Sequence, residues 1–571
     1  MPKRGFHLAI LLILSAQVSF ALRDKNYVPL YQNADTRRAY TVQEMASSVL
    51  VFQRNPEELH PDSFPQTWEK LQELEKLALP GEYCNIYFML HFTSDDELLG
   101  WHIKSLKKSD NKGLAALNWH SFELPFAKRM VGNLPNYTYM PDRFIDYQTR
   151  KMQTGENLLC WLQTRIPNNM QPGLYQAEIE VVLANKRLSL PLKLRLLPFT
   201  LPQPEHIDWV MYASCLQKSL THEENVRMLE EIRDLGVTGL IQHQGLYAEA
   251  DIKKFWQLLR DAKFPLRRLV LDFGAGIEHK SIHAVYGRGP LNTTTTPYAE
   301  CDNPQVAAEF MATLLRIDAW MKKYAGRPFD WWYQGIDEPQ CNGLMGLALW
   351  EYPLAKKIGL KTSATVYPYD ATKQLASIAL DLAVSGSPAN SATDNQKFLQ
   401  LGEQLRLEYW FLGAGSYREQ QGSIAANRLL SGWLFWQSAV PAHVSWTYSW
   451  SRNEFETGKP SWCMAYPRNN KAERIMDSSL QLEGLREGII DYKMIALLHK
   501  LIEEAKMQKK EKPAESAEAL LQNLLSEQIK WRQDFRLARE LNAQRSIDNA
   551  ALEAMRWVLA TEIMKLRELL K

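Results

Sequence analysis

The sequence predicts an α/β fold: a (β/α)8 TIM barrel with an N-terminal β-sandwich and C-terminal helices. Three observations predict it. Residues from about 25 to 200 carry strand-type patterns separated by turn signals. From about 207, apolar strands alternate with amphipathic helices, and beyond Gly488 the pattern is helical to the end. A chain of 571 residues has room for all three units.

The first 21 residues have the features of a secretory signal peptide. Lys3 and Arg4 precede an apolar run from Leu8 to Leu14, and Ser19-Phe20-Ala21 supplies a small-x-small cleavage pattern. We therefore expect residues 1–21 to be removed and the mature chain to be periplasmic or secreted. No later stretch reaches about 18 uninterrupted apolar residues, so no membrane span is expected.

Residues 22–203 are expected to form the β-sandwich domain. Pro172-Gly173 opens a turn before a strand at Tyr175 to Leu183, and Asn185-Lys186 reverses the chain into a second strand. That strand has one apolar face, because leucines occupy every second position from 188 to 196. The segment Pro56 to Leu79 has helical apolar spacing and is expected to be a helical insertion or packing element.

Residues 204–492 are expected to form the barrel, after the boundary marked by Pro202 and Pro204. Eight strand-helix repeats over roughly 250 residues match the size and order of this fold. The expected strands are Trp209 to Ala213, Gly239 to Gln242, Leu266 to Phe273, Phe329 to Ile336, Lys361 to Tyr367, Leu380 to Val384, Glu408 to Gly413 and His443 to Trp450. An open doubly wound sheet is the alternative, but the glycine-rich dinucleotide turn that often accompanies it is missing.

Helices are expected between these strands, and residues 493–571 are expected to form a helical extension that packs on the barrel. The expected interstrand helices are Glu224 to Asp234, Ile252 to Ala262, Gln305 to Lys323, Leu344 to Lys357, Thr372 to Ile378, Gln396 to Leu405 and Ile424 to Gln437. Arg486, Glu487, Asp491 and Tyr492 are expected to lock the C-terminal helix to the barrel through buried ion pairs.

Composition argues against several classes of ligand. The chain has 67 basic and 65 acidic residues, which gives no excess charge for binding nucleic acid. Its 12 histidines and 6 cysteines show no His-Glu-x-x-His or Cys-x-x-Cys spacing, so neither a metal site nor another cofactor is expected. The 18 tryptophans and 23 tyrosines include rings suited to flat, half-polar ligands such as sugars.

The main catalytic candidates are the adjacent acids in Ile336-Asp337-Glu338-Pro339, directly after an aromatic strand. Adjacent acids are common in surface loops, but catalytic groups of TIM barrels concentrate at the C-terminal ends of strands. Pro339 favours an extended backbone at Glu338, so the two carboxylates are expected to diverge.

This spacing fits a particular form of glycoside hydrolysis. A glycosidase that uses two carboxylates needs them about 5 to 9 Å apart, which neighbours on one strand achieve poorly. If the 2-acetamido oxygen of the substrate attacks the anomeric carbon instead, one acid protonates the leaving oxygen and the other holds the acetamide. Glu338 would then need a raised pKa for general acid work, while Asp337 remains ionised.

Several other residues are candidates for contacts with substrate. Trp446, Tyr448 and Trp450 are expected to share one face of the last strand, where an indole can stack on a pyranose, although the lower rings could equally fill the core. Tyr367 and His243, at the ends of strands five and two, are possible hydroxyl partners, with a structural role the alternative for His243.

Longer motifs in the chain resemble a known family. These are Pro191-Leu192 with Phe199-Thr-Leu-Pro202, then Gly335-Ile-Asp-Glu-Pro339, and Leu485-Arg-Glu-Gly-Ile-Ile-Asp-Tyr492. Together they are similar to the glycoside hydrolase 123 family and its DUF4091 relatives, over roughly residues 100 to 500. The resemblance implies an exo-acting N-acetyl-β-galactosaminidase with substrate-assisted retention. It also implies that Glu338 is the acid/base and that Asp337 orients the acetamide.

Three alternatives remain open from the sequence. A glycosidase with two carboxylates would pair Glu338 with a distant acid such as Asp272 and would accept sugars without an acetamide. A catalytically silent carbohydrate-binding protein would keep the aromatic residues but tolerate loss of both acids. A structural or surface-assembly protein would show no dependence on sugar.

Overall fold

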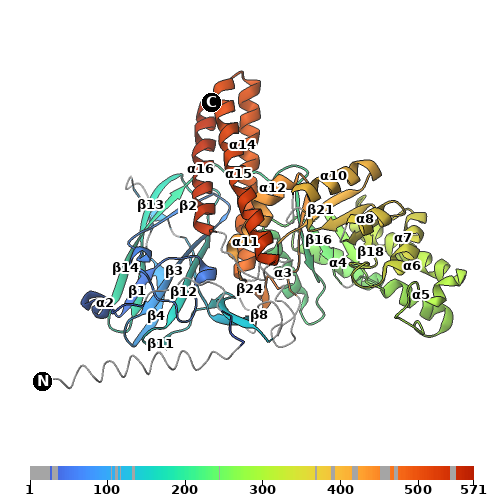
Figure 1. Cartoon of the computed structure of the whole chain (residues 1–571), viewed down its shortest axis with the longest axis horizontal. Helices are drawn as coiled ribbons and strands as arrows, with labels where there is room; N and C mark the ends of the chain where they lie inside the picture. The colour runs from blue at the N-terminus through green and yellow to red at the C-terminus, as the bar shows by residue number, and fades with distance from the viewer. Residues whose placement is uncertain are drawn as a thin grey trace.

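The computed structural model describes most of the chain, and the signal peptide expected at 1–21 lies outside the described part. The described residues are 26–28, 37–104, 106–109, 114–115, 117–130, 135–243, 245–366, 369–387, 392–414, 422–449, 463–468, 474–540 and 548–571. The β-sandwich and the barrel lie side by side along the long axis of the molecule, and the C-terminal helices stand above their junction (Figure 1). Among the described helices, none combines the length and apolar character needed to cross a bilayer.

The N-terminal unit contains two sheets whose facing sides share one core, as the sequence predicts. The first sheet has the order β1 (Val49–Phe52), β3 (Tyr83–Phe92), β12 (Asn157–Arg165), β7 (His120–Leu124) and β10 (Ile145–Asp146). The second has the order β11 (Arg150–Met152), β4 (Asp96–Ile103), β13 (Gly173–Leu183), β14 (Arg187–Leu196) and β2 (Leu74–Ala78), with β5 (Leu106–Lys108) and β6 (Leu114–Ala115) beside it. A hairpin of β8 (Phe126–Met130) and β9 (Tyr137–Pro141) and the helix α2 (Val42–Ser47) complete this unit.

The leucines of β14 face the core at every second position, as expected: Leu188 is partly buried, and the four that follow, from Leu190 to Leu196, are buried. The helix expected over Pro56 to Leu79 is wrong. That segment contains two short 3-10 turns, Pro56–Glu58 and Thr67–Glu69, followed by β2, which pairs in parallel with β14. Trp68 is 79% exposed, so the apolar spacing there does not form a buried helical stripe.

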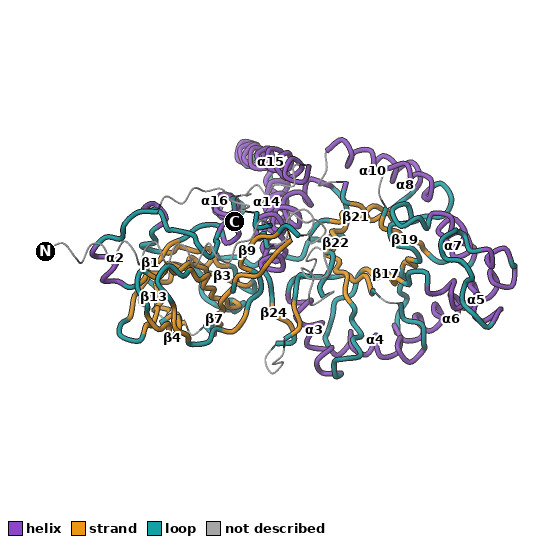
Figure 2. Tube along the Cα trace, turned by 60° about the horizontal axis from the view of Figure 1, so that its bottom comes forward, coloured by secondary structure: helices purple, strands orange, loops and turns teal. Residues whose placement is uncertain are grey.

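Eight parallel strands form the closed barrel, and pairing of the last strand with the first excludes an open sheet. They are β15 (Asp208–Ala213), β16 (Gly239–Gln242), β17 (Arg268–Asp272), β18 (Trp332–Gln334), β19 (Lys361–Thr365), β20 (Leu382–Ser385), β21 (Glu408–Leu412) and β22 (Ala442–Ser445). Figure 2 shows these strands as a ring with the helices outside it.

The outer helices follow the predicted order, with one addition. They are α3 (His222–Asp234), α4 (Glu249–Asp261), α5 (Gly276–Tyr286), α6 (Pro304–Ala325), α7 (Met345–Lys357), α8 (Tyr369–Ala376), α10 (Ala392–Leu405), α11 (Ile424–Arg428) and α12 (Phe435–Ser438), with a 3-10 turn at Ala299–Asp302 and a π-helical turn at Leu429–Leu434. The additional helix is α5, which the sequence did not reveal because its buried face includes the polar residues Glu278 and Ser281.

Three long helices form the C-terminal part: α14 (Leu480–Met507), α15 (Glu511–Glu540) and α16 (Asn549–Leu569). The α14 helix contacts the other two as well as α11, and it begins after a small hairpin of β23 (Tyr466–Pro467) and β24 (Met476–Asp477). The domain boundary expected at residue 492 falls inside α14.

Candidate active site

Asp337 and Glu338 lie just past the C-terminal end of β18, at the end of the barrel where strands deliver side chains to an active site. Both side chains are partly exposed, whereas the preceding residues from Trp331 to Ile336 are buried. A buried strand thus fixes the position of two accessible acids.

A network of hydroxyl and amide groups holds the Asp337 carboxyl group. The Thr365 hydroxyl donates to Asp337, and the Gln334 amide lies 3.4 Å from Asp337 Oδ1. Tyr212 Oη in turn lies 2.9 Å from Thr365 Oγ1 and accepts a long bond of 3.4 Å from Gln334 Nε2. Three barrel strands, β15, β18 and β19, therefore fix this acid.

The pKa of Asp337 is higher than expected for an acid that remains ionised. Burial first, and then the negative charge of Asp272, raise the pKa of Asp337 to about 7. The Thr365 hydroxyl opposes this shift, because its hydrogen bond favours the carboxylate. At neutral pH the Asp337 carboxyl group is therefore close to the midpoint of its titration.

Glu338 has a backbone conformation that the sequence did not predict. Its φ angle is +43°, in the left-handed region, so the extended conformation expected before Pro339 is wrong. The reason is a turn: the Glu338 N–H donates to the Thr365 carbonyl at 3.1 Å, and the Glu338 carbonyl accepts from Cys341 and Asn342. Such a conformation costs about 1–3 kcal/mol for a non-glycine residue and is concentrated at functional sites.

The Glu338 carboxylate is chemically distinct from that of Asp337. Burial alone raises the pKa of Glu338. Among the described residues, none donates a hydrogen bond to its side chain. A carboxyl group that has a raised pKa and is not held by hydrogen-bond donors is suited to general acid catalysis.

His243 and Asp272 form a hydrogen-bonded pair beside the two acids. His243 directly follows β16, and Asp272 is the last residue of β17. His243 Nδ1 lies 2.8 Å from Asp272 Oδ2, and Asp272 Oδ1 accepts from the Gly274 N–H at 3.1 Å. The imidazole ring is partly exposed and lies edge-on to Trp446, with ring centroids 5.9 Å apart. The structure thus places His243 with the acids at the mouth of the barrel.

Trp446 also lies at this mouth, directly after β22. Its indole is partly exposed and meets the Tyr212 ring edge-on, with centroids 4.6 Å apart. Tyr448 does not share this face: it is buried, its hydroxyl donates to Glu231 of α3 at 3.0 Å, and it lines a separate cavity of about 270 Å³. The expectation that Trp446 and Tyr448 lie on one face of a strand is wrong, because β22 ends at Ser445, before both of them.

Two other aromatic candidates, Tyr367 and Trp450, lie outside the described residues.

Sequence reasoning missed Tyr212, Gln334 and Thr365 as members of the site. Each ends a barrel strand or lies next to its end, and that position was the signal that could have identified them. It also missed Asn342, whose amide donates to the Asp337 carbonyl at 2.7 Å.

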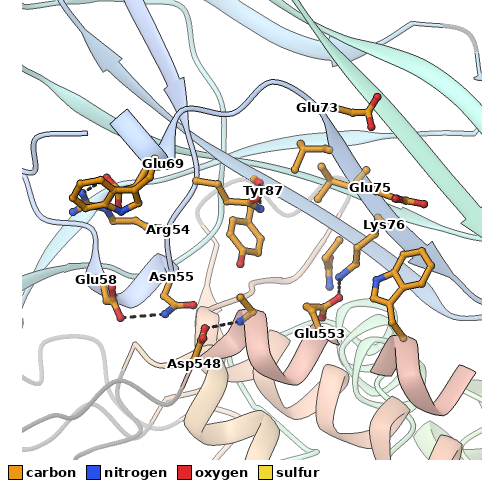
Figure 3. Close-up of a pocket in the computed structure, with 17 residues that line it drawn as sticks. Arg54, Asn55, Glu58, Glu69, Glu73, Glu75, Lys76, Tyr87, Asp548 and Glu553 are labelled. Atoms are coloured by element: carbon orange, nitrogen blue, oxygen red, sulfur yellow. Dashed lines mark hydrogen bonds and ion pairs between the residues drawn. The ribbon is translucent and has the colours of Figure 1, made fainter. Parts of the chain in front are cut away.

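The described part of the chain offers no group of three His, Cys, Asp or Glu side chains arranged to hold a metal ion. A cavity of about 590 Å³ lies between the β-sandwich and α16 (Figure 3). Two ion pairs lie among its lining residues: Arg54 is 2.7 Å from Glu69, and Lys76 is 2.8 Å from Glu553. None of its lining residues comes from the barrel.

No protein-family model matches the sequence. A search of curated proteins found no match either. Among solved structures, the chain is similar to a family 123 glycoside hydrolase from Clostridium perfringens, described for hydrolysis of glycolipid glycans. That match has a TM-score of 0.62 and 14% identity, and it covers 88% of this chain and 95% of the other. An endo-β-1,4-mannanase from Thermotoga petrophila matches with 14% identity over 50% of this chain and 76% of its own, at a TM-score of 0.32. The chain therefore shares its fold, over most of both chains, with a family 123 glycoside hydrolase.

Proposed function

We propose that the chain is an exported glycoside hydrolase that removes a terminal β-linked N-acetylhexosamine, with N-acetylgalactosamine favoured, by a substrate-assisted retaining mechanism. The observation that carries the proposal is the placement of Asp337 and Glu338 side by side at the C-terminal end of β18. The fold shared with a family 123 glycoside hydrolase supports it. Export rests on the signal peptide expected at residues 1–21.

In this mechanism the two acids act on neighbouring carbons of one sugar. The acetamide oxygen forms a bond to C1 as the bond from C1 to the leaving oxygen breaks, and the leaving oxygen takes the proton of Glu338. Water then attacks C1, Glu338 takes a proton from that water, and the bond to the acetamide oxygen breaks. Inversion occurs twice, so the configuration at C1 is retained.

Asp337 stabilises the charge that develops on the acetamide during the first step. As the oxygen attacks C1, positive charge spreads to the amide nitrogen, and a carboxylate beside the N–H favours this state. The network of Thr365, Gln334 and Tyr212 fixes the carboxylate in advance, so little reorganisation is needed. The active form therefore has Asp337 ionised and Glu338 protonated.

Aromatic and polar groups around the acids provide contacts to the sugar. Trp446 offers a partly exposed indole for the apolar face of a pyranose. His243, held by Asp272 through Nδ1, presents a partly exposed imidazole beside Trp446 for contact with a sugar hydroxyl. No metal ion or other cofactor has a role in these steps.

The test is release of an aryl leaving group from matched β-N-acetylgalactosaminide, β-N-acetylglucosaminide and β-galactoside. We expect turnover only of an N-acetylated glycoside. Asp337→Asn should abolish it, and Glu338→Gln should impair it least with a good leaving group, which needs little protonation. Asp330→Asn is a matched control, because Asp330 is an exposed acid just before β18.

Three outcomes would contradict the proposal. Turnover of the plain β-galactoside would indicate a protein nucleophile, with Asp272 the first candidate. Glycan binding that survives in both variants, without turnover, would indicate a carbohydrate-binding protein. A secreted chain that still begins before residue 22 would contradict cleavage after Ala21.

A further inference from the structure

Two glutamates form a fully buried pair behind the strand that carries the proposed catalytic acids. Glu278 of α5 and Glu351 of α7 are each 0% exposed. The Tyr333 hydroxyl lies between them, 3.2 Å from Glu278 Oε1 and 2.9 Å from Glu351 Oε2. Tyr333 has one hydroxyl proton, so it cannot fully satisfy both carboxylates at once.

The other two oxygens of the pair need a proton of their own. Glu278 Oε2 and Glu351 Oε1 are buried and receive no hydrogen bond from a donor in the described structure. The two carboxyl groups are within hydrogen-bonding reach of each other, provided that one of them is protonated. Two buried carboxylates without a proton between them would repel strongly, so a shared proton is the stable state.

The groups that face this pair from the neighbouring elements offer little positive charge. They are Tyr247, His279, Tyr298, Cys301, Tyr333 and Tyr352. Burial raises the pKa of each of these tyrosines and of the cysteine, so they remain uncharged at neutral pH. His279 is the basic residue among them, and its Nε2 lies 3.3 Å from the Tyr298 hydroxyl.

The pair lies directly against the backbone that leads to Asp337. A Cβ atom on Gly335 would lie 2.1 Å from Glu351 Oε1 and 2.3 Å from Oε2, so the carboxyl group fills the space that a side chain would need. The Ile336 N–H acts as a hydrogen-bond donor to Glu351. The next residue of α7, Tyr352, donates to the Ile336 carbonyl at 3.1 Å.

We propose that Glu278 and Glu351 share one proton and, through Gly335 and Ile336, position the segment that carries Asp337 and Glu338. The catalytic consequence rests on the proposed function, whereas the shared proton and the positioning do not. Glu351 is thus a positioning residue. When the pair loses its proton at alkaline pH, repulsion between the carboxylates loosens this segment.

The first test uses hydrogen exchange of the full-length chain and needs no substrate. Protection of the backbone amides in residues 331–340 is measured from neutral to alkaline pH in wild type, Glu351→Gln and Glu351→Met. The carboxamide of Gln supplies an N–H in place of the shared proton, whereas Met fills similar space without a polar group. Glu57→Gln is the control, because Glu57 is also fully buried and burial raises its pKa to about 7.

We expect wild-type protection of 331–340 to fall at alkaline pH, and Glu351→Gln to remove this fall. Glu351→Met should reduce protection already at neutral pH, and Glu57→Gln should leave this segment unchanged. Protection that does not depend on pH in wild type, or an equal pH-dependent fall in Glu351→Gln, would overturn the proposal. If Glu351→Met does not fold, the proposal is tested by comparing the pH-dependent fall in protection of wild type with that of Glu351→Gln and Glu278→Gln.

The second test separates this inference from the proposed function. With a substrate in hand, Glu351→Met should lower kcat by roughly 10- to 100-fold with little change in KM, because misplacement of reacting groups has costs of that order. Glu351→Gln should have a kcat close to that of wild type at neutral pH, and its kcat should persist to a higher pH than that of wild type. If wild type hydrolyses none of the glycosides, the proposed function fails, and the exchange data still decide whether the pair positions the segment.

Discussion

Arg428 Nε lies 2.6 Å from Asp491 Oδ2, and both side chains are completely buried. The second oxygen of Asp491 lies 2.6 Å from Arg556 Nε, so one carboxylate serves two arginines. Arg556 also pairs with Glu487. Because these residues come from α11, α14 and α16, the ion pairs join the barrel to the C-terminal helices, as predicted for Glu487 and Asp491. Arg486 instead pairs with Glu483 of its own helix, and the Tyr492 ring packs against Trp209 of β15.

Asp491→Asn should therefore destabilise the chain strongly. Removing one partner of a buried ion pair leaves uncompensated charge and costs about 3–5 kcal/mol in the free energy of unfolding. Urea denaturation checks this value. Glu503→Gln is the control, because its pair with Lys506 is largely exposed and should contribute little to the free energy of unfolding. Equal effects of the two substitutions would contradict a structural role for Asp491.

Gly488→Ala should also destabilise the contact between α14 and the barrel. A Cβ at Gly488 would lie 2.1 Å from Ser431 Oγ and 2.6 Å from the Arg428 carbonyl oxygen. Overpacking of this kind costs about 1–3 kcal/mol. The matched control is Gly289→Ala, since a Cβ there meets nothing within 4 Å. A thermal midpoint unchanged by Gly488→Ala would show that the helices can move apart without cost.

The barrel could be predicted because its strands are apolar runs at regular intervals, and the acids could be found because they directly follow one of these runs. The same signal marks Tyr212 and Thr365 as residues at strand ends, but it does not show that their side chains meet. They are 153 positions apart in the chain, and only closure of the barrel brings their hydroxyl groups within 2.9 Å. Local sequence carries no signal for that contact.

Other errors have equally specific causes. The leucines of β2 are spaced as in a helix, but pairing with its neighbour β14, more than 100 residues later in the chain, determines their conformation. The prediction for Tyr448 requires a strand that continues to residue 450, whereas β22 ends at Ser445, three residues before Tyr448. The backbone of Glu338 follows its hydrogen bonds to Thr365, Cys341 and Asn342, which outweigh the preference set by the following proline.

Asp337→Asn should stabilise the chain at neutral and alkaline pH while abolishing activity. The pKa of Asp337 is about 7 in the folded chain and 3.8 in the reference state, so folding takes up a proton between these values. Stability contributed by the protonated acid is complete below about pH 3.8 and is lost as pH rises toward 7. Asparagine does not titrate and should remove this loss.

The measurement is the thermal midpoint of wild type and Asp337→Asn at several pH values. We expect the two curves to agree at low pH and to separate as pH rises, with the variant higher. A wild-type midpoint above that of the variant at pH 8 would contradict a raised pKa for Asp337. The control is again Asp330→Asn, whose exposed carboxylate should give a curve parallel to that of wild type.

Trp446→Ala and Tyr448→Phe should separate substrate binding from folding. Trp446 is partly exposed at the barrel mouth, so its loss should raise KM about tenfold, equivalent to about 1.4 kcal/mol, with little change in stability. Tyr448→Phe removes the buried hydroxyl that donates to Glu231. Glu231 then keeps one donor, the Ile475 N–H, which lies 2.8 Å from Glu231 Oε1. It should lower stability by about 1–3 kcal/mol and leave KM unchanged. A raised KM in Tyr448→Phe would place that ring in the substrate path and contradict the geometry described for the loop after β22.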